Sequence, residues 1–171
     1  MPEPSDLITG RPLPQREDEP VRQAAERLLL DLGYDPGQVR VEASRELAWG
    51  EGTLLVRADL LVLVREAPAL LLRCARGSLV SREREAVAAA RLIDPLCPPL
   101  AAVYNGDEAE LLEVAGGRVL ASGPGAIPGP AELERLAREH PRPATGPRQI
   151  TQAARVYQAY SFISCPGQCT V

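Results

Sequence analysis

The sequence predicts a mixed α/β protein built on one central sheet. Of the 171 residues, 45 % are apolar and 25 % are charged, which is typical of a globular chain that can bury a core. Short apolar segments rich in Leu and β-branched residues are interleaved with segments of helical periodicity. The predicted order is a helix, three strands, a helix, a strand, a hairpin and C-terminal helices. A helix that connects two strands of one sheet favours a parallel pair among antiparallel neighbours.

The first third of the chain predicts a helix followed by a strand. Pro20 is suited to the first turn of a helix, where its missing N–H is not needed, and Gly33 is suited to the position after the last turn. Val21 and Ala25 have the spacing of a buried helical face. Residues 38–47 alternate apolar and polar side chains, which predicts a half-buried strand.

The central third predicts two buried strands and a helix. Residues 53–65 form a long apolar run, which we interpret as a central strand covered on both faces. Residues 69–75 predict a second, shorter buried strand. Ser81 is expected to cap a helix that runs to about Asp94.

The last third predicts a sheet edge and two further helices. Residues 99–105 predict a strand that ends in an Asn-Gly turn, and residues 109–114 and 118–121 predict a hairpin across a Gly-Gly turn. Two helices are expected beyond the next Pro- and Gly-rich stretch, over residues 131–139 and 149–162.

These elements suggest four regions. We expect an N-terminal arm at 1–16, a core domain at 17–122, a Pro- and Gly-rich linker with a short helix at 123–147, and a C-terminal helix with a cysteine-containing tail at 148–171.

Composition excludes several kinds of chemistry. All 19 basic residues are Arg, so a Schiff-base lysine and a P-loop lysine are absent. The single histidine, His140, excludes a multi-histidine metal site. The net charge of −4 argues against a protein that coats nucleic acid. Abundant Arg, Ala, Leu, Gly and Pro are typical of a bacterial gene of high GC content.

The sequence also suggests a compartment. No apolar run reaches the roughly 18 residues needed to span a bilayer, and the N-terminus lacks the pattern of a secretory signal. We therefore expect a cytoplasmic protein with reduced cysteines and no membrane partner.

Several spaced segments in a fixed order resemble a known family. They are EPVRQAAERLLLDLGY at 19–34, RVE at 40–42, VRADLLVL at 56–63, LLLRCARGSLVSREREAVAAARL at 70–92 and VYNGDEAELLEV at 103–114. Residues 17–122 as a whole resemble the N-terminal domain of type I restriction enzyme R subunits, most of all small stand-alone proteins built from it. The resemblance implies a restriction-endonuclease-like fold with an α-β-β-β-α-β core.

The resemblance also implies where an active site would lie. In active nucleases of this group, an Asp on the second strand and a Glu-x-Lys on the third hold a divalent metal and activate water. Asp59 occupies the Asp position, but Arg73 replaces the Glu and Ala75 replaces the Lys. A Gln and a Tyr that are often present on the following helix fall on Glu85 and Ala89.

These replacements suggest that the metal has been lost. A fixed guanidinium repels a dication, and Arg does not deprotonate in proteins. We hypothesise that Arg73 acts as the counter-ion of Asp59 in place of the metal. The alternative structural interpretation is that Asp59 pairs with Arg57 on its own strand.

Three functions remain open at this point. The first is a catalytically degenerate nuclease-fold module that binds DNA weakly or binds a protein, with no cofactor. The second is a metal-dependent DNA endonuclease whose site has migrated to Asp59 and Glu85, with Glu42 or Glu26, and which uses Mg²⁺ or Mn²⁺. The third is a protein-interaction module that acts through residues 148–171. The oligomeric state is not indicated.

Two further groups of residues have more than one interpretation. The local cluster of Arg73, Arg76, Arg82 and Arg84 could contact phosphates, but interleaved acids also fit a solvated helix face with ion pairs. Cys165 and Cys169 could supply half of a zinc or redox site, although Cys74 is expected in the core.

Overall fold

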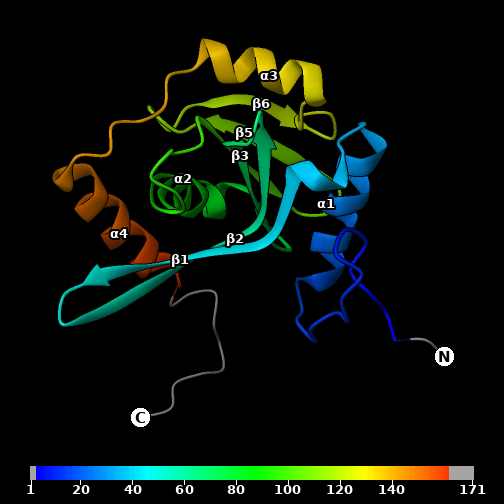
Figure 1. Ribbon diagram of the computed structural model, residues 1–171, viewed down its shortest axis with the longest axis horizontal. Helices are drawn as coiled ribbons and strands as arrows, with labels where there is room; N and C mark the ends of the chain where they lie inside the picture. The colour runs from blue at the N-terminus through cyan, green and yellow to red at the C-terminus, as the bar shows by residue number, and fades with distance from the viewer. Residues whose placement is uncertain (1–2, 162–171) are drawn as a thin grey trace.

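The computed structural model describes residues 3–161, which form one six-stranded mixed sheet with helices on both faces (Figure 1). The strands are β1 (Val39–Trp49), β2 (Gly52–Val64), β3 (Ala67–Cys74), β4 (Leu100–Tyr104), β5 (Ala109–Glu113) and β6 (Val119–Gly123). They lie in chain order across the sheet, and every neighbouring pair is antiparallel except β3 and β4, which are parallel. The predicted mixed α/β sheet is therefore confirmed.

Four α-helices cover this sheet in the described part of the chain. They are α1 (Glu19–Asp31), α2 (Glu83–Leu92), α3 (Pro130–Glu139) and α4 (Pro147–Ser161). Short 3-10 turns precede β1 (Pro36–Gln38) and α2 (Val80–Arg82). The α2 helix is the crossover that makes the β3–β4 pair parallel.

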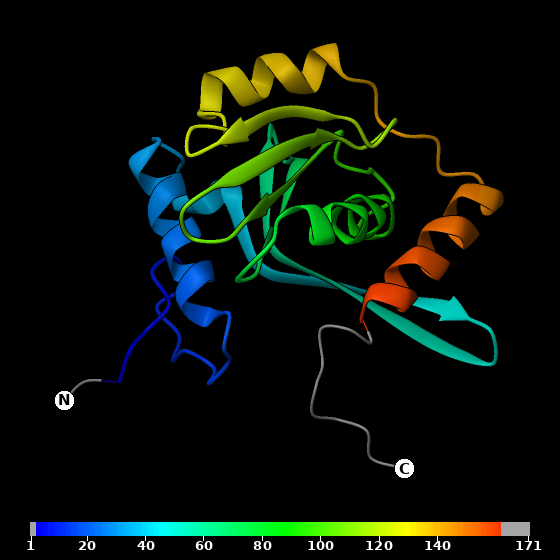
Figure 2. The same ribbon diagram turned by 180° about the vertical axis from the view of Figure 1, so that it is seen from behind.

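The sheet separates two apolar cores. The α2 and α4 helices pack on one face of the sheet, against Leu71, Ala101, Val103 and Leu112. Along their strands, these residues alternate with residues that point to the other face. The α1 and α3 helices pack on that second face, against Leu70, Leu72, Leu100, Ala102 and Leu111 (Figure 2). This period of two is expected of strands buried on both sides.

The long β1–β2 hairpin bends in the middle (Figure 1). Glu42 has a φ of +52° at the bend, and it lies opposite Asp59 in the register that pairs Val41 with Leu60. On the α2 side of the sheet, the core residues of β2 change from even positions such as Ala58 to odd positions such as Leu61 across this bend. Asp59 therefore lies at the position where the β2 residues that point to the α2 side of the sheet change from even to odd numbers.

The bend also corrects the interpretation of residues 53–65. Beyond Asp59 the strand is buried on both faces, as predicted, but before it burial alternates with exposure at Leu55 and Arg57. The exposed half belongs to the part of the hairpin that extends past the sheet and lies alongside α4 in both views (Figures 1 and 2). There, the Trp49 indole N–H donates to the Gln158 side chain at 3.0 Å.

The predicted cap of α2 is wrong. Ser81 lies in the 3-10 turn that precedes the helix, and its hydroxyl donates to the carbonyl of Ser78. Arg82 occupies the cap position without a side-chain cap, and the helix ends at Leu92 rather than near Asp94.

The described part of the predicted N-terminal arm is folded against α1. Residues Ser5 and Pro12 form a bridge, and the Asp6 side chain between them is 4 % exposed. Asp6 accepts the backbone N–H and the hydroxyl of Thr9, at 2.7 and 2.9 Å, and it also contacts α1.

Two expectations concern the cysteines and the membrane. Cys74 is buried and free in the core as predicted, whereas Cys165 and Cys169 lie outside the described residues. Within residues 3–161, no helix has both the length and the hydropathy needed to cross a bilayer.

Candidate functional site

A charged group lies where β2, β3 and the first turn of α2 meet. Because Leu60 pairs with Leu72, Asp59 and Arg73 lie opposite each other on β2 and β3. Arg73 Nη1 is 3.1 Å from Asp59 Oδ2, and the backbone N–H of Cys74 donates to the same oxygen at 2.7 Å. The hypothesis that Arg73 is the counter-ion of Asp59 is confirmed in its geometry.

The other edge of the same guanidinium binds α2. Arg73 Nη2 is 2.7 Å from Oε1 of Glu85, whose side chain is 2 % exposed. The second oxygen of Glu85 is 3.4 Å from Arg82 Nη1, one helical turn earlier. Arg73 thus bridges two carboxylates that come from different layers of the protein.

Burial and charge act together on this group. Burial raises the pKa of the Asp59 carboxyl above its ordinary value, although the Arg73 charge and the Cys74 N–H oppose that change. Burial would lower the pKa of Arg73, but the charges of Asp59 and Glu85 outweigh it and hold that pKa above its ordinary value. Arg73 is therefore a permanent cation between the two carboxylates.

All of these residues lie in the part of the chain that a protein-family model matches. The model describes the type I restriction enzyme R protein N terminus and matches residues 17–128, about two thirds of the chain. The chain belongs to this family. No curated protein and no solved structure gives a significant match.

The match defines which elements make up the type I restriction enzyme R N-terminal domain in this chain. It begins just before α1 and ends between β6 and α3. The α3 and α4 helices therefore lie beyond the matched part, although Leu133, Ala154 and Tyr157 from them are buried in the two cores.

The divalent metal implied by the resemblance does not fit this donor set. Asp59 and Glu85 are carboxylates of the kind that Mg²⁺ and Mn²⁺ bind, but the Arg73 guanidinium lies between them and is bonded to both. Ala75 supplies no cation at the Lys position. Within residues 3–161, no group of three or more His, Cys, Asp and Glu side chains is arranged to hold a metal ion.

Two residues considered with Asp59 lie elsewhere. Glu42 is on the exposed edge strand, where it pairs with Arg16 instead of joining Asp59 and Glu85. Arg57 is exposed, and its backbone N–H donates to the Tyr157 hydroxyl at 3.0 Å. The alternative pairing of Asp59 with Arg57 is therefore wrong, because Arg73 takes that place.

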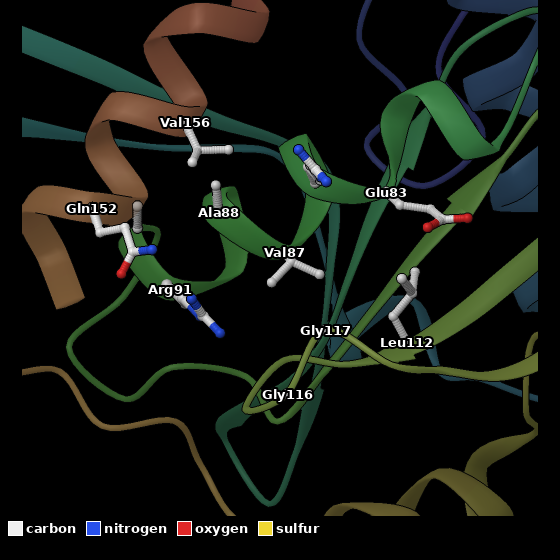
Figure 3. A pocket seen from close by; sticks show the side chains of 11 residues that line it. Glu83, Val87, Ala88, Arg91, Leu112, Gly116, Gly117, Gln152 and Val156 are labelled. Carbon is white, nitrogen blue, oxygen red and sulfur yellow. The ribbon is translucent and has the colours of Figure 1, made fainter.

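The predicted basic cluster is divided by the structure. Arg73 and Arg82 are bonded to Glu85, whereas the Arg76 side chain is exposed. Arg84 lies on the other side of α2, at a separate cavity (Figure 3). Two of the four residues form ion pairs, but their partner is a buried carboxylate, so these pairs do not lie on the solvated helix face that was the alternative interpretation.

A second charged group on α1 was missed. The side chains of Glu19, Arg22 and Glu26 are at most 8 % exposed, and Arg22 Nη1 lies 2.9 Å from Asp6 Oδ2 and 3.1 Å from Glu26 Oε1. Burial raises the pKa of Glu26 to about 8, and a hydrogen bond to Asp6 and the negative charge of Asp6 raise it further. The sequence signal for this group was the spacing of Glu19, Arg22 and Glu26, which places three charged side chains among the apolar residues of one helix face.

This α1 group adjoins the first site. The charge of Arg22 opposes the rise in the pKa of Asp59, so Asp59 is influenced by Arg73 on β3 and by Arg22 on α1. Glu26 is not a free carboxylate for a migrated metal site, because it is fully buried and bonded to Arg22.

Proposed function

We propose that this member of the type I restriction enzyme R N-terminal family is a catalytically inactive, restriction-endonuclease-like domain that serves as a binding or accessory module. The observation that carries the proposal is the bridge from Asp59 through Arg73 to Glu85. The order α1-β1-β2-β3-α2-β4, with β3 and β4 parallel, supports the restriction-endonuclease-like core.

The physical reason is the cost of separating these charges. A divalent cation that bound Asp59 and Glu85 would have to displace the Arg73 guanidinium and leave it unpaired beside the metal. Removing one partner from a buried ion pair costs about 3–5 kcal/mol. Metal-assisted hydrolysis also needs a cation to orient the attacking water, and Ala75 cannot supply it.

Charge favours a protein partner over duplex DNA. The net charge of the chain is −4, and two of the four clustered arginines are engaged with Glu85. A DNA-binding surface needs several free cations to neutralise phosphates. We therefore infer that any contact with DNA is weak and depends strongly on salt.

A cleavage assay tests the loss of catalysis. Supercoiled plasmid is incubated with the full chain in Mg²⁺ and separately in Mn²⁺, alongside an Asp59→Asn variant prepared in the same way. The proposal predicts equal, background cleavage by the two proteins. Cleavage by the wild type that Asp59→Asn abolishes would establish the alternative, a metal-dependent endonuclease with a migrated site.

A further inference from the structure

The described part of the N-terminal arm, residues 3–16, lies beside α1 in both views (Figures 1 and 2). Backbone hydrogen bonds within the arm hold it together, for example from Asp6 to the carbonyl of Arg11 and from Leu13 to the carbonyl of Pro4. The arm precedes the part of the chain that the family model matches. Its attachment to α1 depends on contacts that involve side chains.

One buried carboxylate makes most of these contacts. Asp6 is 4 % exposed, and its Oδ2 lies 2.9 Å from Arg22 Nη1 and 3.2 Å from Gln23 Nε2. The Gln23 side chain also accepts the backbone N–H of Leu7 at 3.1 Å. The apolar contribution is small, because Leu7 is 41 % exposed and Ile8 is only partly buried against the core. Docking of the arm therefore depends chiefly on Asp6.

The group that receives Asp6 contains more acids than cations. Asp6, Glu19 and Glu26 all pair with the single guanidinium of Arg22, and each of these four side chains is at most 8 % exposed. Three ionised carboxylates and one cation would carry a net charge of −2 with almost no contact with water, and burial makes such a charge very costly. The group is therefore expected to hold a proton.

Glu26 is the carboxyl that holds this proton. It is fully buried, and its Oε2 meets no hydrogen-bond donor among the residues that the structure describes. Burial raises the pKa of Glu26 to about 8. Burial would also raise the pKa of Asp6, but hydrogen bonds, first of all those from Thr9, lower it to about 2. In the hydrogen bond that joins the two carboxyls, Glu26 is therefore the donor and Asp6 the acceptor.

The other titratable groups around Glu26 do not replace this contact. Arg22 lies 3.1 Å from Oε1 of Glu26 and also binds Asp6. On β3, the Cys74 thiol has a pKa well above its ordinary value because it is buried, so it stays neutral. On β2, Asp59 is influenced by the charge of Arg22 but has its own partner on β3. Loss of the proton therefore leaves Asp6 and Glu26 as two anions that share one cation.

We propose that the arm is a proton-controlled clasp: neutral Glu26 holds Asp6 on α1, and ionisation of Glu26 releases residues 3–16 while the rest of the protein stays folded. Asp6 is the group that leaves, because Glu19, Arg22 and Glu26 belong to one helix, whereas the arm has few apolar contacts. Released Asp6 regains its hydration and no longer repels Glu26. Release also uncovers the charged face of α1, so the clasp controls access to this face.

Methyl NMR of the full chain, labelled at the isoleucine δ1 carbons, tests the clasp. Ile8 reports on the arm, whereas Ile93 and Ile127 are buried in the two cores and report on the fold. From pH 5 to about pH 9.5, the Ile8 signal should move from its docked position toward that of a peptide of residues 3–16, with both core signals unchanged. The docking equilibrium constant should fall by at most about tenfold per pH unit up to about pH 8 and then level off.

Two glutamine variants separate the clasp from other effects of pH. Glu26→Gln has no proton to lose and keeps a donor for Asp6, so its Ile8 signal should stay at the docked position at every pH. Glu17→Gln, which changes an exposed acid next to the arm, should keep the wild-type profile. The proposal is overturned if the wild-type Ile8 signal stays docked throughout, if it moves equally in Glu26→Gln, or if it moves only together with the core signals.

Discussion

Asp59 and Arg73 lie opposite each other on two neighbouring antiparallel strands, with 3.1 Å between the carboxylate oxygen and the guanidinium nitrogen. The same guanidinium continues to Glu85 on α2. One arginine side chain therefore connects β2, β3 and α2. We propose that it takes the place between β2 and β3 that a divalent metal has in the active nucleases that the chain resembles.

Replacing Arg73 should destabilise the fold. Arg73→Met keeps much of the side-chain volume but leaves Glu85 with its weaker contact to Arg82 and leaves Asp59 with the Cys74 N–H. We expect a loss of about 3 kcal/mol in the free energy of unfolding, measured by urea denaturation.

The matched control for this experiment is Arg57→Met. Arg57 lies on β2, the strand that pairs with the strand of Arg73, but it is exposed and forms no ion pair with a described residue. The change should therefore stay within about 0.5 kcal/mol. Equal stability of the Arg73→Met variant and the wild type would show that the bridge contributes nothing to the fold.

Glu26 should make stability depend on pH. Its pKa in the folded protein is about 8, above its ordinary value of 4.5, so folding favours the protonated form. The stabilisation is therefore complete below about pH 4.5 and is lost as the pH rises toward 8, with a slope of at most about 1.4 kcal/mol per pH unit.

Glu26→Gln keeps the neutral state at every pH, so urea midpoints between pH 5 and pH 9 should fall less for this variant than for the wild type. Glu46→Gln, at an exposed position on β1, should keep the wild-type pH profile. The account of Glu26 would be wrong if the wild type and Glu26→Gln lost stability in parallel.

The α4 helix should behave as part of the domain. Tyr157 is 5 % exposed, packs into the core beneath α2 and accepts the backbone N–H of Arg57. Tyr157→Phe should cost about 1 kcal/mol through the lost hydrogen bond, and Tyr157→Ala about 3–5 kcal/mol through the cavity it leaves.

Arg155→Ala, on the exposed side of the same helix, serves as the control and should change little. Thermal unfolding distinguishes these variants. If Tyr157→Ala unfolded at the wild-type temperature, α4 would be an independent segment, as the protein-interaction alternative requires.

Much of the fold could be predicted from sequence because its signals are local. Pro20 and Gly33 bound the first helix, and the Asn105-Gly106 and Gly116-Gly117 turns separate the last strands. Adjacent antiparallel strands also made the contact between Asp59 and Arg73 predictable. The predicted start of α2 at Ser81 is wrong, because a 3-10 turn over Val80–Arg82 precedes the helix. In that turn the Ser81 hydroxyl donates to the Ser78 carbonyl instead of capping α2.

The remaining features depend on contacts between distant parts of the chain. The bend at Glu42 alters which side chains of β1 and β2 share a face, so spacing alone assigned Arg57 wrongly as a partner of Asp59. The pairing of Asp6 with Arg22 joins residues 16 positions apart and requires the folded N-terminal segment. Periodicity within a single helix does not carry that information.

Calorimetric titration of Mn²⁺ tests the central claim most directly. It compares the wild type, Asp59→Asn and the double variant Arg73→Glu/Ala75→Lys, which restores the Glu-x-Lys pattern, all at low salt and with folding checked by circular dichroism. We predict no saturable heat for the wild type or Asp59→Asn, and saturable binding for the double variant. Saturable Mn²⁺ binding by the wild type that Asp59→Asn removes would contradict the claim that Arg73 has replaced the metal.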